Sequence, residues 1–485
     1  MSLGKRIRHG TKWSFFSNFS GQAFQFIFGV ALARILVPAD FGVIVTVKIF
    51  TGLAGYFASG GLGEALVQKK EIDGAHYRLV FTLQMLVGVV FYSIFYFIAP
   101  FLSAFFNDPV YGSLIQVSAI SFMLAPLSNM HRTRLRRDMN FKAMAGVQLA
   151  SLFVAGLVSI YLALNNFGPW SLVFGGLAGE FSAMIILRLL VDCPLRFYFN
   201  AELAKTLGRY GVKTSINEIL VYLRGQTPNF LLAKFLGSGD VGLFNKADSL
   251  NMLPLTIIGS SVYQPIFRSL STIQDDINQT RYIYLKTVSL MMLYMLPFYV
   301  GLYWLSEPFI YLVYGESWLG AVSILKILAF LGVLFCVGYP AGAILAAQDW
   351  LGREIYMQFI SWVILIIGCF VALDWGGVGI AWAIVVSRLY SVSHMFFLVY
   401  KCIGIRLKDL IESARSSLLL NIIVFVVLYG MDMLLFDLGI DLLTPTYFIS
   451  MVLTAVSVYV LIFLFVPLKG LTEESSRWRK VLKIV

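Results

Sequence analysis

Long hydrophobic stretches, separated by short polar segments, run along the whole chain. Each is long enough to cross about 30 Å of hydrocarbon as an α-helix, which takes about 20 residues. Gly, Pro and charged residues interrupt the pattern often enough to separate fourteen helices. They are predicted to begin near residues 12, 41, 78, 111, 144, 167, 214, 240, 284, 319, 355, 376, 415 and 445. The pattern therefore predicts an all-α polytopic membrane protein with fourteen transmembrane helices.

The composition agrees with this prediction. Of the 485 residues 59% are apolar and only 13% are charged, whereas charged residues make up about 25% of an ordinary soluble domain. The apolar stretch after the basic start is too long for a signal peptide and lacks a small-residue cleavage site, so it is read as a retained first span. The four cysteines show no CxxC spacing, so neither a metal site nor a disulfide framework is predicted, and no cofactor is expected.

The positive charge follows the predicted topology. The net charge is +11, and 30 of the 37 Lys and Arg residues lie in the two termini and in every second connection. Basic residues are retained on the cytoplasmic side of membrane proteins, which places both termini in the cytoplasm and leaves no need for a nucleic-acid partner. The alternate connections contain no basic residue beyond Arg34 and Lys234, which lie at span ends.

Short sequence matches recur at offsets of 200 to 208 residues and indicate an internal repeat. They pair Arg8-x-Gly10 with Arg209-x-Gly211, LARILVPADFGV (32–43) with LAKFLGSGDVGL (232–243), Pro100-Phe101 with Pro308-Phe309, and Gly168 with Gly376. An even number of spans in each half lets the halves repeat in the same orientation, about an axis along the membrane normal. The predicted division is 1–200 and 201–405, each with six spans, followed by 406–485 with the last two spans and a cytoplasmic tail.

Charged residues within the spans point to a polar interior. The basic ones are Arg34, Lys48, Arg224, Lys234, Lys246, Lys326 and Arg388, and the acidic ones are Glu64, Glu180, Glu218 and Asp248. A charge at mid-bilayer costs about 2.5–3.5 kcal/mol on insertion scales, so such residues normally face other protein or a wet cavity. The excess of basic over acidic residues predicts a cationic cavity.

Arg224 carries the strongest functional hypothesis among these charges. It lies near the middle of its span in YLRGQTPNF, where Gly225 and Pro228 predict a weakened helix, because proline removes one backbone hydrogen bond. A broken helix within the membrane is tolerated where it lines a cavity. On an ideal helix, however, Arg224 points about 200° away from Tyr222, on the side opposite the polar residues of the same span.

Polar faces mark the first span of each predicted half. Asn18, Gln22 and Gln25 share one face of the first span, as do Gln226 and Asn229 of the seventh, because residues three and four apart lie on the same side of a helix. Both helices are therefore predicted to line a central cavity.

Three of the basic positions also have a structural interpretation. Arg34 and Lys234 lie at outer span ends and can extend their ammonium or guanidinium groups to the headgroups. Lys246 shares a span with Asp248 and can pair with charges of the seventh span. No catalytic arrangement, phosphate-binding glycine loop or nucleotide domain accompanies these residues, which favours a transporter over an enzyme or an ATP-driven pump.

Four segments resemble the polysaccharide transporter family of the multidrug/oligosaccharidyl-lipid/polysaccharide flippase superfamily. They are LARILVPADFGV (32–43), GLGEALVQ (61–68), RLRRDMNF (134–141) and LLAKFLGSGDVGLFNKADSL (231–250). Within that family the resemblance is strongest to Wzx-type exporters of colanic-acid and lipopolysaccharide repeat units. The resemblance implies two six-helix lobes that alternate between cytoplasm-facing and periplasm-facing states in the bacterial inner membrane.

The implied substrate is an oligosaccharide repeat unit on undecaprenyl pyrophosphate, which is flipped to the periplasmic leaflet before polymerisation. Fixed positive charge suits a pyrophosphate, and side-chain amides suit a sugar. The candidate residues are Lys48, Arg224, Lys246 and Arg388 for the headgroup, Arg34 and Lys234 as outer-side contacts, and the amides Asn18, Gln22, Gln25, Gln226 and Asn229. The last two spans are predicted to guide the lipid tail, and a polymerase and a chain-length regulator are implied partners.

Several alternatives stay open. The membrane potential favours outward movement of a pyrophosphate and is worth about 2.3 kcal/mol per charge at 100 mV; alternatively, Glu180, Glu218 or Asp248 carries a proton or a sodium ion. A cation-coupled multidrug antiporter on the same scaffold is the chief rival, although it is expected to have an acidic cavity. A non-transporting partner of a polysaccharide polymerase is the third possibility.

Overall fold

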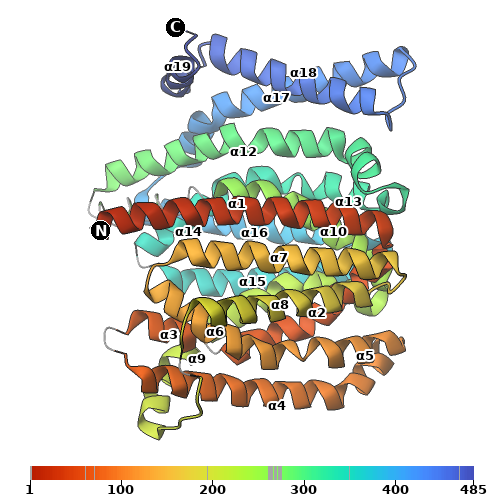
Figure 1. Ribbon diagram of the computed structural model, residues 1–485. Coiled ribbons are helices and arrows are strands. Elements are labelled where there is room, and N and C mark those ends of the chain that lie inside the picture. Colours follow the sequence, from red (N-terminus) through yellow and green to blue (C-terminus); the bar gives the residue numbers. More distant parts are fainter. Residues whose placement is uncertain are drawn as a thin grey trace. The chain divides into compact units, whose positions relative to one another are not determined.

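The computed structural model describes the backbone of residues 3–59, 62–69, 72–193, 195–259, 266, 270, 273, 276–348, 350–468 and 470–484. The side chains of these residues are described too, except at 3–12, 14, 15, 57–59, 64, 65, 68, 206–218 and 351–355. Helices account for almost all of this part of the chain, which contains no β-strand (Figure 1).

The helices of the first half are α1 (Leu3–Ile35), α2 (Pro38–Ser59), α3 (Leu62–Gln68), α4 (Gly74–Phe106), α5 (Pro109–Ser118), α6 (Ser121–Arg137), α7 (Phe141–Leu164), α8 (Trp170–Leu190), α9 (Ala201–Phe235) and α10 (Ser238–Pro254). The π-helical turn η1 (Leu255–Gly259) extends α10. The later elements are α12 (Ile277–Val313), η2 (Glu316–Trp318), α13 (Ala321–Leu328), α14 (Leu331–Ala347), α15 (Leu351–Val371), η3 (Leu373–Trp375), α16 (Gly376–Ile403), α17 (Leu407–Asp437), α18 (Pro445–Phe465) and α19 (Thr472–Val481).

Each predicted hydrophobic stretch lies in one helix or in two consecutive helices. Within the described residues, nine helical segments are long and apolar enough to cross a membrane, and a tenth is added if α13 and α14, which meet at a 45° bend, form one span. The helices α1, α9 and α10 fall outside this set, in keeping with the polar residues along them. The chain is therefore a multi-pass membrane protein.

The chain packs into two compact units, Met1–Gly242 and Leu243–Val485. In the first unit α7 packs against α1 and α8, and α9 packs against α2, α3 and α4. In the second, α12 contacts α14 and α17, while α16 contacts α14 and α15. This division by packing differs from the repeat boundary predicted at residue 200, because α9 and the first turn of α10 pack with the helices that precede them.

Several helices begin well before the hydrophobic stretch that predicted them. The span predicted near residue 12 starts at Leu3, and the one predicted near 214 starts at Ala201. In both cases a basic segment continues the helix on the side predicted to be cytoplasmic. Hydropathy marks where a helix enters hydrocarbon, not where its backbone hydrogen bonding begins.

The predicted break near Gly225 and Pro228 is wrong, because α9 runs as one helix from Ala201 to Phe235 with the proline inside it. The hydroxyl of Thr227 donates to the carbonyl of Leu223 at 2.8 Å. Side-chain hydrogen bonds of this kind, together with neighbouring helices, let a membrane helix keep its course through a proline.

The repeated motif adopts the same local structure in both copies. One helix ends at Ile35 and the next begins at Pro38, and likewise one ends at Phe235 and the next begins at Ser238. Each second helix has an acid in its first turn, Asp40 in α2 and Asp240 in α10, where a negative charge interacts favourably with the helix dipole. Arg34 and Lys234 end the preceding helices, where a positive charge is favourable for the same reason.

The glycines of the two motif copies meet each other. A Cβ atom at Gly42 would lie 1.7 Å from the backbone oxygen of Ser238, and one at Gly242 would lie 1.9 Å from the backbone oxygen of Pro38. Each glycine thus faces the first residue of the other helix, and the two relations are equivalent at an offset of 200 residues. The first turns of α2 and α10 touch backbone to backbone, which no larger residue at these two positions would allow.

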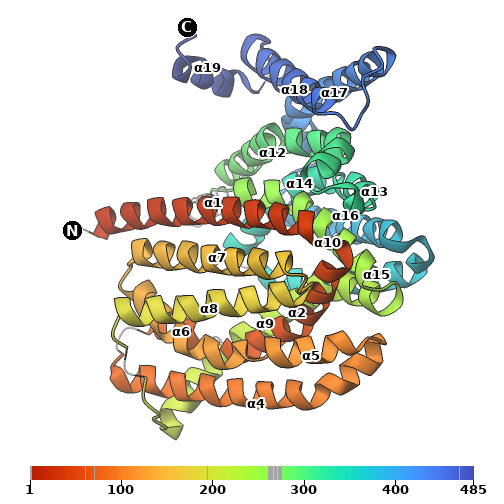
Figure 2. The same ribbon diagram turned by 45° about the vertical axis from the view of Figure 1, so that its right-hand side comes forward.

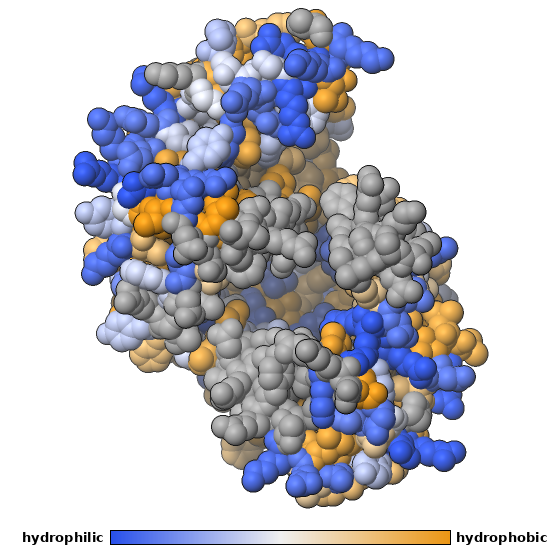
Figure 3. Space-filling model, turned by 90° about the vertical axis from the view of Figure 1, so that its left-hand side faces the viewer, coloured by the Kyte–Doolittle hydropathy of each residue, from blue (hydrophilic) through white to orange (hydrophobic). Residues whose placement is uncertain are grey.

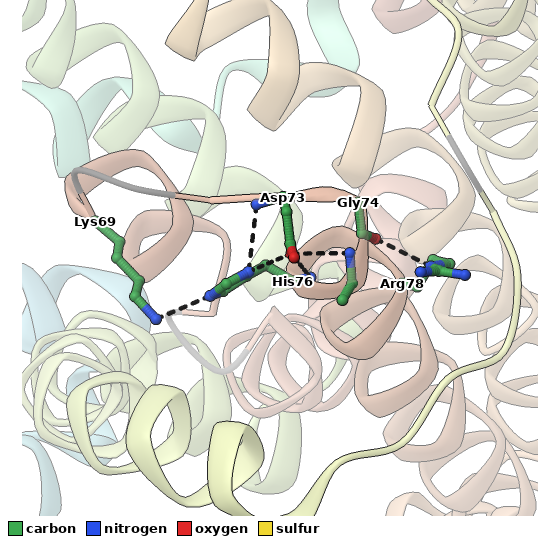
Figure 4. Close-up of polar contacts among 6 residues, drawn as sticks. Lys69, Asp73, Gly74, His76 and Arg78 are labelled. Atoms are coloured by element: carbon green, nitrogen blue, oxygen red, sulfur yellow. Dashed lines mark hydrogen bonds and ion pairs between the residues drawn. The ribbon is translucent and has the colours of Figure 1, made fainter.

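A polar cluster holds the start of α4 (Figure 4). The carboxylate of Asp73 accepts hydrogen bonds from the backbone N–H groups of Ala75 and His76 at 3.0 and 3.1 Å. The imidazole of His76 lies 2.6 Å from this carboxylate and 2.8 Å from the ammonium of Lys69. Asp73 therefore satisfies donors that the helix start leaves unpaired, and His76 links α4 to the end of α3.

The hydrogen bond from His76 holds the pKa of Asp73 below its usual value. A carboxyl group with a lowered folded-state pKa stabilises the protein above its unfolded pKa, near 3.9, and this contribution is lost as the pH falls through the folded value. Asp73→Asn keeps a hydrogen-bond acceptor but not the charge. We therefore expect this variant to lose less thermal stability than the wild type does as the pH falls below about 5. Thermal unfolding of the wild type and of Asp73→Asn in detergent, measured across this pH range, tests the prediction. Equal decreases in the melting temperatures of the two proteins would contradict it.

Hydrophilic residues are frequent on the face that Figure 3 shows. In the first unit the exposed basic residues include Arg136, Arg188 and Lys205, and in the second unit they include Lys401, Lys408 and Arg415. This distribution matches the side predicted to be cytoplasmic.

Candidate functional site

A polar cavity of about 550 Å³ lies within the first unit. It is bounded by α2, α5, α6, α8 and α9, so that helices far apart in sequence each contribute part of its wall. The polar side chains that line it are Lys48, Thr51, Ser118, Ser121, Asn129, Glu180, Tyr222 and Gln226. Three of the residues predicted from the sequence, Lys48, Glu180 and Gln226, are thereby brought together.

Two cations surround the one acid of this cavity. Lys48 on α2 and Arg132 on α6 both lie close enough to Glu180 on α8 to interact with its charge. Lys48 and Glu180 are exposed to the cavity, whereas Arg132 is half-buried. Lys48 and Glu180 are the charged residues among the described ones that line the cavity, and Arg132 acts on the charge of Glu180 from outside this lining.

Tyr222 attaches α9 to α2 beside Lys48. Its hydroxyl donates to the backbone carbonyl of Lys48 at 2.6 Å and lies 3.2 Å from that of Ile49. Its ring lies over Gly52, where a Cβ atom would come within 2.2 Å of the hydroxyl oxygen. The missing side chain at Gly52 therefore lets Tyr222 reach the helix backbone and fix the segment that carries Lys48.

This contact predicts that a substitution at Tyr222 restores part of the activity that a substitution at Gly52 removes. Gly52→Ala is expected to displace Tyr222 and lower activity by about tenfold, since forcing atoms into a packed site costs roughly 1–3 kcal/mol. Tyr222→Leu removes the atoms that clash and should restore part of the activity in the double variant. Gly55→Ala on the same helix, where a Cβ meets nothing within 4 Å, is the matched control. A translocation assay of the four variants measures this, and a double variant that is more impaired than Gly52→Ala would contradict it.

The two amides of α9 form one unit. Asn229 is 6% exposed and donates from its side-chain nitrogen to the amide oxygen of Gln226 at 3.0 Å. Gln226 lines the cavity, whereas Asn229, which the sequence predicts as a direct contact, is not among the described residues that line it.

The other predicted residues of the first unit lie elsewhere. Asn18, Gln22, Gln25 and Arg34 on α1, and Arg224 on α9, are not among the described residues that line the cavity. Asn18, Gln25 and Arg34 are exposed, and Gln22 and Arg224 are half-buried. For Arg224 this agrees with its direction away from Tyr222, which does line the cavity. The side chain of Glu218 lies outside the described residues.

Lys234 is used to join two helices. Its ammonium donates to the carbonyl of Phe105 at 2.7 Å and lies 3.9 Å from the centre of the Phe105 ring. Phe105 is in the last turn of α4, whose carbonyls have no partner within the helix. The basic residue of the second motif copy therefore caps α4, which supports the structural interpretation of this position.

In the second unit, Lys246 lies against two aromatic rings. Its ammonium is 4.6 Å from the centre of the Tyr314 ring and 4.8 Å from that of Trp318. Arg388 stacks at 5.3 Å on Phe335 and is close enough to Asp248 for their charges to interact. Aromatic faces attract cations most strongly where water is excluded. Lys246 and Arg388 are therefore held by residues of their own unit in this structure.

An apolar groove of about 390 Å³ also lies in the second unit. Its walls come from α10, α12, α17 and α18, and include Phe298, Leu305, Val424, Phe448 and Val456. The helices that the sequence predicts to guide a lipid tail thus supply one side of it.

Two residues were not identified as candidates from the sequence: Asn129, which lines the cavity, and Arg132, which acts on the charge of Glu180. Arg132 lies in HRTRLRR, which reads as a cytoplasmic loop but continues as helix α6 to Arg137. Asn129 and Arg132 are three residues apart and share a face of that helix. A helical reading of this segment would have found both.

Comparison with known proteins identifies the family. The family model described as "Polysaccharide biosynthesis protein" matches residues 31–323. A membrane protein encoded in the cps region of Klebsiella pneumoniae is 25% identical, over 99% of both chains. The lipopolysaccharide biosynthesis protein WzxC of Escherichia coli K12 is 23% identical, over 90% of this chain and 89% of that one.

The fold is similar to that of a solved flippase. Lipid II flippase MurJ, in an inward closed conformation, matches with a TM-score of 0.71 at 16% identity, over 98% of this chain and 99% of that one. The similarity over the whole length shows a shared fold, and the matched family model covers more than half of the chain and includes all five helices of the polar cavity in full. The resemblance predicted from the sequence is confirmed, and the chain belongs to the polysaccharide biosynthesis protein family of membrane proteins.

Proposed function

We propose that this protein is a flippase that moves undecaprenyl-pyrophosphate-linked oligosaccharide repeat units from the cytoplasmic to the periplasmic leaflet. The observation that carries the proposal is the cavity of the first unit, which Lys48 lines and where Lys48 and Arg132 both act on the charge of Glu180. Phosphate oxygens bind Lys and Arg through short, charge-assisted hydrogen bonds. The family and the fold shared with a lipid flippase support it.

The chemistry of the cavity suits a sugar phosphate. Gln226 and Asn129 offer amide donors and acceptors, and Tyr222, which lines the cavity, forms an aromatic pair with Tyr56 with ring centres 5.1 Å apart. The apolar groove of the second unit suits a polyprenyl chain, since its lining is almost wholly aliphatic and aromatic. A lipid-linked oligosaccharide needs both kinds of surface.

The architecture proposed for this function has fourteen spans, in two six-helix lobes at 1–200 and 201–405, followed by 406–485. Both termini face the cytoplasm of the bacterial inner membrane. Alternating access of a central cavity moves the headgroup, with Lys48 as a direct contact and Arg132 acting through the charge of Glu180. We retain Arg224, Lys246 and Arg388 as contacts made in another conformation, and Glu180 and Asp248 as candidate carriers of a proton or sodium ion. A polymerase and a chain-length regulator are the proposed protein partners.

The multidrug antiporter is the rival function, and the cavity argues against it. An organic cation would need the acid to dominate, whereas Glu180 is offset by two cations. Glu180→Gln separates the two functions: it removes a competitor for the cations and is expected to keep or raise affinity for a pyrophosphate lipid, while a cation exporter would lose affinity for its substrate.

Depletion of the protein in its host provides the first test of the proposed function. Lipid-linked repeat units are expected to accumulate with their sugars facing the cytoplasm, and a plasmid copy of the wild-type gene should clear them. Normal surface polysaccharide without any such accumulation would refute the proposal.

A further inference from the structure

The last helix, α19, has an apolar face that the protein covers only in part. Leu471, Ser475, Trp478 and Leu482 follow one another at spacings of four, three and four residues, and so lie on one side of a helix. Leu471 and Ser475 are buried at 2% and 3% exposure, but Trp478 and Leu482 are 39% and 51% exposed. The apolar side therefore continues beyond the part that packs against the protein.

Basic residues line the other sides of the same turns. Arg477 and Lys480 are exposed within α19, and Lys483 is exposed two residues after the helix ends. An amphipathic helix with an aromatic residue on one face and Lys or Arg on the other is typical of helices that lie in a membrane interface.

Polar contacts fix α19 to the span α12. Lys286 forms an ion pair with Glu473 at 3.2 Å. The hydroxyl of Tyr294 donates to Glu474 at 2.6 Å and accepts from the indole N–H of Trp478 at 2.8 Å. The helix is thus held at a defined level along α12.

We expect that level to be the boundary of the hydrocarbon, because α12 is much longer than a span needs to be. The 37 residues of α12 measure about 55 Å at about 1.5 Å per residue, far more than the roughly 30 Å of a bilayer core. Its last 20 residues or so, from about Tyr294 onward, suffice to span that core. α19 begins seven residues after α18 ends at Phe465, a distance that keeps it near the same boundary.

The direction of α19 agrees with this level. In Figure 1 it is seen along its axis, whereas α17 and α18 run across the view, and in Figure 2 it is seen from the side. It therefore lies crosswise to the spans of its own unit, as a helix in the membrane plane does.

We propose that α19 binds an anionic phospholipid surface on the same side of the membrane as the start of α12. Trp478 and Leu482 enter the boundary between headgroups and acyl chains, and Arg477, Lys480 and Lys483 contact lipid phosphates. Charge complementarity selects this partner: a cationic rim around an apolar face fits anionic headgroups. The inference rests on α12 and α18 spanning the membrane and does not depend on the transported substrate.

The test uses the full chain in vesicles. The four native cysteines are replaced by alanine, Leu482→Cys is labelled with an environment-sensitive fluorophore, and quenching by aqueous iodide is measured. In vesicles of equal parts phosphatidylcholine and phosphatidylglycerol the probe is expected to be shielded. Each removed charge should weaken membrane contact about fivefold, so Arg477→Gln/Lys480→Gln/Lys483→Gln should restore quenching. High salt should do so in part.

The matched control removes three exposed cations elsewhere in the same unit, Lys401→Gln/Lys408→Gln/Arg415→Gln, and should leave the probe shielded. Equal quenching with and without phosphatidylglycerol would overturn the proposal. Shielding that persists after the three cations of α19 are removed would overturn it too, because lipid phosphates would then not be what holds the face at the membrane. Translocation is not measured, so failure here is distinct from failure of the flippase function.

Discussion

Lys48→Ala is expected to lower the rate of lipid-linked oligosaccharide translocation by roughly ten- to hundredfold. Lys48 lines the same cavity as Glu180, and a hydrogen bond to a charged group contributes about 1.5–3 kcal/mol. At about 1.4 kcal/mol per factor of ten, removing it gives the stated loss. Initial rates in proteoliposomes at equal protein content measure the effect.

Two variants make this result specific. Lys48→Arg keeps a cation in the same place and should retain a substantial part of the activity. Lys408→Gln removes a cation whose side chain is 83% exposed and should leave the rate unchanged. If Lys48→Ala matches the wild type, or if Lys408→Gln is equally impaired, the cavity is not the headgroup site.

Gly42→Ala and Gly242→Ala are each expected to reduce translocation more than tenfold and to lower the melting temperature. Each added methyl group would lie less than 2 Å from a backbone oxygen, of Ser238 or Pro38 respectively. Backbone at such a contact cannot move aside as a flexible side chain can, so the cost exceeds the roughly 1–3 kcal/mol of ordinary overpacking.

The neighbouring Gly239 provides the control. It lies in the same first turn of α10, and a Cβ atom there meets nothing within 4 Å. Gly239→Ala should be as active as the wild type and no less stable, since alanine favours helix more than glycine does. Equal behaviour of Gly42→Ala and Gly239→Ala would show that the contact between α2 and α10 is not needed.

The hydrophobic stretches predicted the positions of the helices well, but they did not predict the lengths of the helices or whether a helix continues through a proline. The stretch near residue 111 becomes two consecutive helices, α5 and α6, and α9 continues through Pro228. Both outcomes depend on hydrogen bonds and neighbouring helices that a hydropathy pattern does not contain. The internal repeat was visible at residues 32–43 and 232–243, yet only the structure shows that its glycines face each other.

The candidate site was predictable where a charge had to face a cavity. Lys48 and Glu180 follow from the cost of charge within a span, and they line the same cavity. Partners of the other cations lie far away in sequence: Lys234 contacts Phe105, and Lys246 contacts Tyr314. A single sequence without these contacts gives no means of separating a substrate ligand from a cation held by aromatic rings. Arg132 was not predicted from the sequence, because the basic residues around it made this part of α6 resemble a cytoplasmic loop.

The central claim is that this chain moves a pyrophosphate-linked oligosaccharide across a bilayer. The most direct measurement reconstitutes the purified protein in liposomes with a lipid-linked oligosaccharide and follows how much of its headgroup becomes protected from an enzyme or lectin added outside. The account predicts time-dependent protection by the wild type and little by Lys48→Ala. Headgroups that stay on their original face in wild-type liposomes, while the protein exchanges organic cations, would contradict it.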